Sequence, residues 1–142
     1  MRLKKARKTE SNTIRRGDLS CEIAINQSEA LVSGTVKYRA YEVGTVSGAT
    51  TEAIAGQFLS ICELVNDGSM VRDGTIMTGY HNEISGGDVL LLDGEIVGQW
   101  RSDEEGWCHF VAYSATEITC SAPSPWLLQD TIFEWLSDGK TD

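Results

Sequence analysis

The C-terminal third of the chain carries the pattern that most restricts its folds. Two stretches rich in strand-forming residues, 89–92 and 95–100, flank the dipeptide Asp93-Gly94. Asp-Gly in this setting is a strong signal for a two-residue hairpin turn. Segments 107–113 and 116–121 follow, each after a short turn, and both resemble strands in composition. The pattern therefore predicts an antiparallel meander.

The register of this meander decides which side chains face a covering element. Pairing Trp100 with Trp107 and Tyr113 with Thr116 gathers apolar residues on one face and leaves the other face mixed. The apolar face then holds Ile96, Trp100, Trp107, His109, Val111, Tyr113, Ile118 and Cys120. A closing helix is expected to cover it, because Ser124 is a good N-cap and Pro125 suits the first helical position. The apolar stripe of this helix consists of Trp126, Leu128, Ile132, Phe133, Trp135 and Leu136.

The first half of the chain predicts strands followed by a helix. Residues 19–25 alternate between apolar and polar side chains, and residues 30–43 are rich in strand formers, so we expect a hairpin. Residues 51–66 have helical periodicity. The whole chain is predicted to adopt an α+β fold, with an antiparallel sheet of about six or seven strands, a hairpin and then a meander, and two helices packed on one face.

Charge divides the chain near residue 16. Residues 1–16 hold seven basic residues and one acidic residue, a formal charge of +6, whereas residues 17–142 hold five basic and twenty acidic residues, a formal charge of −15. We expect a flexible basic arm over residues 1–16 and a single acidic α+β domain over residues 17–142. Because an acidic body repels phosphate groups, nucleic acid is expected to bind only through the arm. The candidate contacts are Lys4, Lys5, Arg7, Lys8, Arg15 and Arg16.

The sequence lacks the patterns of membrane and metal-binding proteins. Its longest aliphatic run, residues 89–92, is far shorter than the roughly 20 residues of a membrane-spanning helix. The basic N-terminus is followed by polar residues rather than by the apolar stretch of a secretory signal. The four cysteines are widely spaced and form no CxxC pair. We therefore expect a cytoplasmic protein with reduced cysteines, no membrane contact, no metal and no cofactor.

Catalytic patterns are equally sparse, and we expect no catalytic residue. Cys108 and His109 are adjacent in a predicted strand, so their side chains point to opposite faces and cannot form a nucleophile–base pair. On the register above, His109 lies on the apolar face, which is typical of a hydrogen-bonded core histidine. His81 precedes the Gly86-Gly87 loop, where a histidine can act as a general acid or base.

The leading functional hypothesis is a small acidic protein-binding module without catalytic activity. Its partner is expected to be another protein with a basic surface, and a homodimer is an alternative. Small acidic α+β proteins of this size are familiar as immunity proteins, as inhibitors or accessory proteins of phages and other mobile elements, and as secretion chaperones; this is an analogy of size and charge. The candidate binding residues are Trp100, Trp107, His81, Asp103, Glu104 and Glu105.

A second hypothesis is a small-molecule or nucleotide-binding protein, or an enzyme, with a pocket between the sheet and a helix. His81, Glu83, the Gly86-Gly87 loop and the mixed face of the meander would supply its polar groups. The sequence leaves both hypotheses open.

Overall fold

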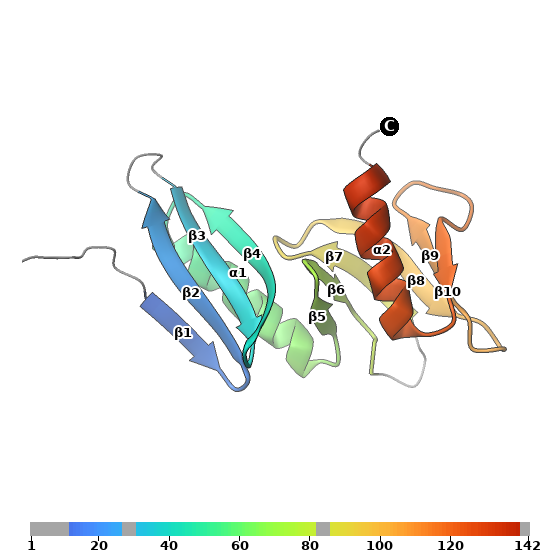
Figure 1. The fold of residues 1–142 in the computed structure, drawn as a ribbon, viewed down its shortest axis with the longest axis horizontal. Helices are drawn as coiled ribbons and strands as arrows, with labels where there is room; N and C mark the ends of the chain where they lie inside the picture. Colours follow the sequence, from blue (N-terminus) through green and yellow to red (C-terminus); the bar gives the residue numbers. More distant parts are fainter. Residues whose placement is uncertain (1–11, 27–30, 82–85, 140–142) are drawn as a thin grey trace, which may run out of the picture. The chain divides into compact units, whose positions relative to one another are not determined.

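The computed structural model describes residues 12–26, 31–81 and 86–139. Within these residues the chain forms ten strands and two helices (Figure 1). The strands form two antiparallel sheets, one of four strands and one of six, whereas the sequence predicted one sheet of six or seven strands. The predicted α+β class, with antiparallel strands and two helices, is confirmed.

Contacts within the chain define two compact units, residues 1–62 and residues 63–142. The two units differ in formal charge, although the positive charge of the first comes from residues 1–16. Residues 1–62 hold nine basic and six acidic residues, a formal charge of +3, and residues 63–142 hold three basic and fifteen acidic residues, a formal charge of −12. The acidic character of the chain therefore belongs to the second unit.

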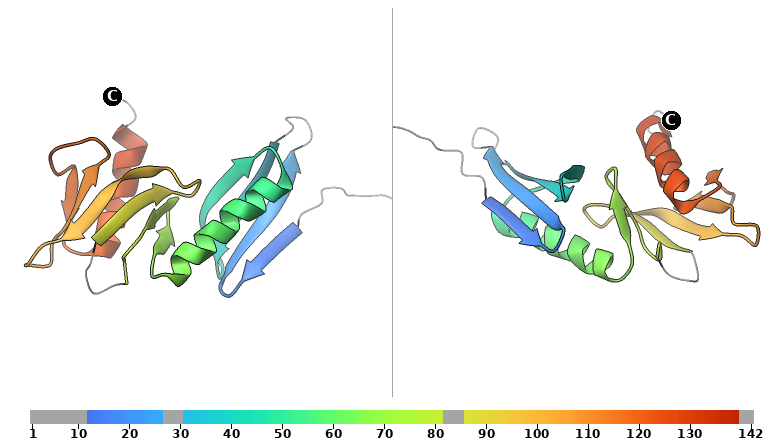
Figure 2. Two further views of the ribbon diagram at one scale, coloured as in Figure 1. Left: turned by 180° about the vertical axis from the view of Figure 1, so that it is seen from behind. Right: turned by 60° about the horizontal axis from the view of Figure 1, so that its bottom comes forward.

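The first unit is a four-stranded sheet with a helix across one face (Figure 2). Its strands follow each other in chain order: β1 (Asn12–Arg16), β2 (Leu19–Asn26), β3 (Leu31–Tyr38) and β4 (Tyr41–Gly48). Helix α1 (Thr51–Asn66) occupies the predicted range. Its first turn is capped by Thr50, whose hydroxyl oxygen accepts a hydrogen bond from the backbone N–H of Ala53 at 3.0 Å.

Strand β1 lies within the segment predicted to be a flexible arm. Its five residues pair with β2, and Ile14 lies opposite Cys21. Arg15 and Arg16 are therefore exposed residues of an edge strand. Lys4, Lys5, Arg7 and Lys8 lie outside the described residues.

The core of the first unit depends on the close approach of α1 to β3 at Gly34. A Cβ atom at this position would lie 2.7 Å from the Cys21 sulfur and 2.8 Å from the Ile54 Cγ2 atom. Both neighbours are fully buried. Gly34 therefore leaves the space into which the helix packs.

We expect Gly34→Ala to lower the free energy of unfolding of the first unit by about 1–3 kcal/mol, because a methyl group is forced into a filled core. Gly56→Ala is the matched control, since a Cβ atom at this exposed helical position meets nothing within 4 Å. It should stabilise α1 by about 0.5–1 kcal/mol. Hydrogen exchange of the β2 and β3 amides measures both effects. Equal exchange rates in the two variants would contradict the prediction.

The second unit is a six-stranded sheet with strand order β10-β9-β8-β7-β6-β5. The strands are β5 (Met70–Arg72), β6 (Thr75–Met77), β7 (Gly86–Leu91), β8 (Ile96–Ser102), β9 (Cys108–Ala112) and β10 (Cys120–Ala122). Helix α2 (Pro125–Gly139) packs against β6, β9 and β10 (Figure 1). It begins at the predicted residue, and the Ser124 hydroxyl oxygen accepts a hydrogen bond from the Leu127 N–H at 3.1 Å. The hydrophobic core of the second unit consists of Met77, Val89, Trp100, Cys108, Phe110, Ala122, Leu128 and Ile132.

The meander has a different register from the predicted one. Trp100 lies opposite Phe110 rather than Trp107, a shift of three residues. Because side chains alternate along a strand, an odd shift exchanges the two faces of β9 relative to β8. Cys108 and Phe110 therefore share the buried face with Trp100, and His109 points to the opposite face. The prediction of His109 as a core histidine is wrong.

Candidate functional site

The face of the second sheet opposite α2 carries a row of polar residues across neighbouring strands. Gly86 of β7, Arg101 of β8, His109 of β9 and Ser121 of β10 are successive backbone partners in this row. The inward-facing neighbours of these residues fill the core against α2. We call Arg101, His109 and Ser121 the polar row.

Within the polar row, His109 is held between a hydroxyl group and a carboxylate. Its Nδ1 atom lies 2.7 Å from the Ser121 Oγ atom, and its Nε2 atom lies 2.9 Å from the Asp103 Oδ2 atom. The other carboxylate oxygen, Oδ1, accepts hydrogen bonds from the backbone N–H groups of Glu105 and Trp107 at 2.9 and 3.0 Å. The hydrogen bond from His109, together with the two backbone N–H groups, lowers the pKa of Asp103. An ionised Asp103 accepts a hydrogen bond from the Nε2–H group, and in this tautomer the Nδ1 lone pair faces Ser121.

This ionisation makes stability depend on pH in a defined direction. Since the pKa of Asp103 is lower in the folded chain than in the unfolded chain, its contribution is present above the unfolded pKa and is lost as pH falls through the folded pKa. We expect wild type to unfold at higher urea concentration than Asp103→Asn near pH 6, and the difference to shrink as pH falls below about 4, the ordinary pKa of an aspartate. Urea titrations across this range measure it, and a difference that stays constant would contradict the assignment.

A shallow depression of about 290 Å³ lies beside the row, lined by Gly86, Gly87, Asp88, Gln99, Trp100, Arg101 and Ser102. It therefore lies along β7 and β8, whereas the second hypothesis expected a pocket between the sheet and a helix. Gly86, Gly87, Gln99 and Arg101 belong to the segments named for that pocket. His81 is not among the lining residues, and Glu83 lies outside the described residues. Among the described residues, no ion pair involves Arg101.

The remaining predicted contact residues have different surroundings. Trp100 is 3% exposed, and its indole N–H donates a hydrogen bond to the Thr78 carbonyl oxygen at 2.8 Å. Trp107 is 45% exposed and lies in the same turn as exposed Glu104 and Glu105. His81 is exposed, and its ring packs edge-on against Tyr80. Trp107, Glu104 and Glu105 are thus accessible, and their role as partner contacts stays a prediction.

None of the cysteines is suited to act as a nucleophile. All four are free thiols. Burial raises the pKa of each one, and it raises that of Cys120 to about 11. Because the thiolate is the reactive form, the raised pKa disfavours nucleophilic attack by these side chains.

Helix α2 has an outer face that combines aromatic and acidic side chains. Trp126 and Phe133 are 49% and 45% exposed, although the sequence placed both in the buried stripe. Asp130 and Glu134 accompany them at helical spacing on the same side. From Pro125 to Gly139 the helix carries no basic residue. We call Trp126, Asp130, Phe133 and Glu134 the outer face of α2.

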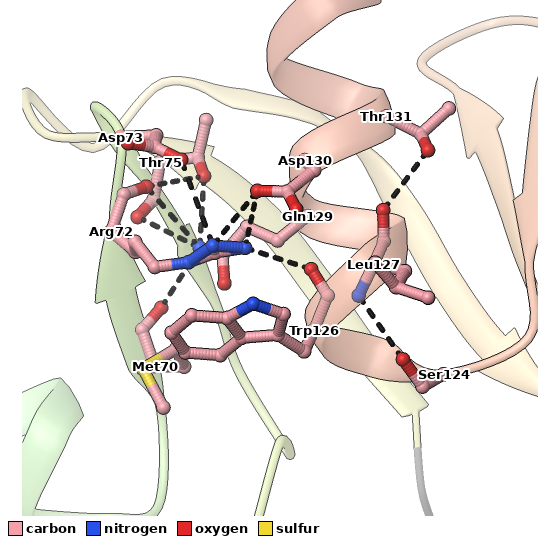
Figure 3. Close-up of polar contacts among 10 residues, drawn as sticks. All are labelled: Met70, Arg72, Asp73, Thr75, Ser124, Trp126, Leu127, Gln129, Asp130 and Thr131. Carbon is pink, nitrogen blue, oxygen red and sulfur yellow. Dashed lines mark hydrogen bonds and ion pairs between the residues drawn. The ribbon is translucent and has the colours of Figure 1, made fainter.

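Arg72 of β5 fixes one end of this outer face (Figure 3). Its guanidinium lies 3.6 Å from the centre of the Trp126 ring. It donates hydrogen bonds to the Asp130 Oδ1 atom at 2.9 and 2.7 Å and to the Trp126 carbonyl oxygen at 2.7 Å. Cation–π stacking and charged hydrogen bonds together hold the indole in one position.

The fully buried Gln129 lies on the inner side of α2 and binds the helix to β5 and β6. Its amide N–H group donates a hydrogen bond to the Thr75 hydroxyl oxygen at 2.9 Å, and the carbonyl oxygens of Met70, Arg72 and Thr75 lie within 3.4 Å (Figure 3). Because a buried polar side chain needs hydrogen-bond partners, Gln129 orients this side of the helix toward β5 and β6. Trp126 and Phe133 consequently face outward.

Further observations complete the description of these surfaces. In the part of the chain that the structure describes, no helix combines the length and apolar character needed to cross a membrane. The same residues contain no cluster of three or more histidine, cysteine or acidic side chains that could hold a metal ion. Comparisons of the chain with protein families, curated proteins and solved structures found no match.

Proposed function

We propose that this chain is a protein-binding module whose second unit captures a basic partner protein through the outer face of α2. The observation that carries the proposal is the coincidence of charge and aromatic exposure. The second unit has a formal charge of −12, and the outer face of α2 adds two half-exposed aromatic rings to that charge. Its occupant is a protein with an apolar groove bordered by lysine and arginine side chains.

Exposed aromatic side chains are the residue type that most often dominates binding energy at protein interfaces. Phe133 and Trp126 lie seven residues apart, or about two helical turns, so both can enter one groove. Arg72 already fixes the Trp126 ring, and binding therefore loses little side-chain entropy at this position.

The carboxylates contribute a separate effect. Asp130 and Glu134 border the rings, and the rest of the unit adds a long-range negative field. Such a field attracts a basic partner and speeds association, and salt screens it. The identity of the basic partner would decide whether the chain acts as an inhibitor, an immunity protein or an accessory protein of a phage or other mobile element.

Site-specific photocrosslinking identifies the occupant. Benzoylphenylalanine is placed at position 133 or, as a matched control, at position 41 of the first unit, where Tyr41 is 75% exposed. We expect position 133 alone to yield a crosslinked protein with a basic surface, identified by mass spectrometry. The crosslinking is done at about 0.15 M salt, where long-range attraction between copies is screened. A crosslink to a second copy of the chain, or to an acidic protein, would contradict the proposal.

The purified partner then gives a quantitative measurement. Phe133→Ala should weaken binding by about 30-fold or more, Tyr41→Ala should change it less than twofold, and added salt should reduce the association rate. Phe133 is chosen because its ring is not part of the Arg72 contacts. Unchanged affinity of the Phe133→Ala variant would overturn the proposal.

A further inference from the structure

The geometry of the polar row points to a second activity, independent of partner binding: we propose that Ser121, His109 and Asp103 form a nucleophile–base–carboxylate relay that cleaves short-chain carboxylic esters. The relay draws on a turn residue and two neighbouring strands. The outer face of α2 contributes nothing to it.

The first requirement is a hydroxyl group beside a base. Ser121 is exposed, and its Oγ atom lies within hydrogen-bond distance, 2.7 Å, of His109 Nδ1. The two residues are direct partners on adjacent strands, so the backbone ladder rather than a loop sets their separation. This is the contact by which an imidazole activates a serine.

The second requirement is a carboxylate that orients the base. Asp103 accepts a hydrogen bond from the Nε2–H group of His109 at 2.9 Å. The backbone N–H groups of Glu105 and Trp107 hold its other oxygen in place. The carboxylate therefore fixes the tautomer with a free Nδ1 lone pair and stabilises the imidazolium that forms during the reaction. The roles of the two ring nitrogens are exchanged relative to serine proteases, and the proton path is equivalent.

The third requirement is positive charge for the oxyanion. Arg101 is the partner of His109 on the other side of the row. Within the described residues of the second unit, Arg72 is paired with Asp130 and Asp73, whereas no ion pair involves Arg101. Its backbone lies two strand spacings from that of Ser121, roughly 10 Å, and both side chains belong to the same face of the sheet. Arg101 is thus the cation of this face available to the oxyanion.

The reaction balances with water as the only co-reactant. The Ser121 oxygen bonds to the ester carbonyl carbon while its proton passes to His109 Nδ1. The carbon–alkoxy bond then breaks, and the leaving alcohol takes the proton from the imidazolium. Water then attacks the acyl carbon and gives a proton to His109 Nδ1. The bond between the acyl carbon and the Ser121 oxygen breaks, the imidazolium returns its proton to that oxygen, and a carboxylic acid leaves.

A fluorophosphonate probe tests the nucleophile directly. We expect the folded wild-type chain to be labelled at Ser121, as located by mass spectrometry. Labelling should be lost in Ser121→Ala and should fall by at least 100-fold in His109→Gln. Ser33→Ala, which removes an exposed strand hydroxyl in the first unit, should label as wild type. Circular dichroism confirms that each variant is folded.

Hydrolysis of p-nitrophenyl acetate provides a readout that a purely structural role would not change. The wild-type rate should exceed that of Ser121→Ala by at least 100-fold. Arg101→Gln should lower kcat more than it raises KM. A folded wild-type chain that is not labelled at Ser121, or that hydrolyses the ester no faster than Ser121→Ala, would overturn the proposal. Neither result bears on crosslinking at position 133.

Discussion

Replacing Trp100 with alanine is expected to lower the free energy of unfolding of the second unit by about 3–5 kcal/mol, the usual cost of removing a buried aromatic side chain. The ring is 3% exposed within the core beneath α2, and its N–H donates to the Thr78 carbonyl oxygen. The truncation therefore opens a cavity and leaves that carbonyl without a side-chain donor. Such a loss is comparable to the whole stability of many small domains.

Tryptophan fluorescence during urea unfolding measures this effect in the right part of the chain. All four tryptophans belong to the second unit, so the signal reports that unit alone. Trp107→Ala is the matched control, because its side chain is 45% exposed and its loss should change stability by no more than about 0.5 kcal/mol. Similar midpoints for both variants would contradict the placement of Trp100 in the core.

The second large effect is expected at Arg72. Its side chain is 13% exposed, and it joins β5 to the first two turns of α2 through Trp126 and Asp130. We expect Arg72→Ala to lower the free energy of unfolding of the second unit by about 2 kcal/mol, the scale of charged hydrogen bonds in a partly buried setting. Arg72→Lys should recover less than half of this loss, because an ammonium group cannot reproduce the fork or the stacking on the indole.

A double-mutant cycle with Asp130→Asn separates the ion pair from the stacking contact. The two single changes should be strongly non-additive, because both remove the same hydrogen bonds between Arg72 and Asp130. The indole stacking should remain in Asp130→Asn and be lost in Arg72→Ala. Additive effects in the urea titration would show that this ion pair does not contribute.

The elements that were predicted well are those whose bounds are set by a few neighbouring residues in the sequence. The bounds of α1 and the start of α2 follow from caps at Thr50 and Ser124, which the structure confirms. A hairpin joins β7 and β8 at Asp93-Gly94 as predicted, although its loop has three residues, 92–94, rather than two. In each case a few consecutive residues contain the whole signal.

The sequence did not predict strand β1, and the reason is physical. Its sequence, Asn-Thr-Ile-Arg-Arg, has no apolar alternation beyond Ile14. An edge strand needs only backbone hydrogen bonds on one side and exposes most of its side chains to water. Its composition is therefore the same as that of an unstructured basic segment.

The candidate surfaces of the second unit depend on long-range features that composition does not encode. The polar row exists because Asp103 folds the turn between β8 and β9 so that Ser102 lies opposite Cys108. The outer face of α2 exists because Gln129, a polar residue, points inward to Thr75. A conventional apolar stripe for α2 would instead bury Trp126 and Phe133.

The separation of charge between the units has a consequence for concentrated solutions. A chain with a positive block and a negative block attracts its own copies head to tail, even though its net charge of −9 would suggest mutual repulsion. This attraction acts over about 10 Å at 0.1 M salt and over about 30 Å at 0.01 M. The chain should accordingly cloud when dialysed into dilute buffer and clear again when salt is restored.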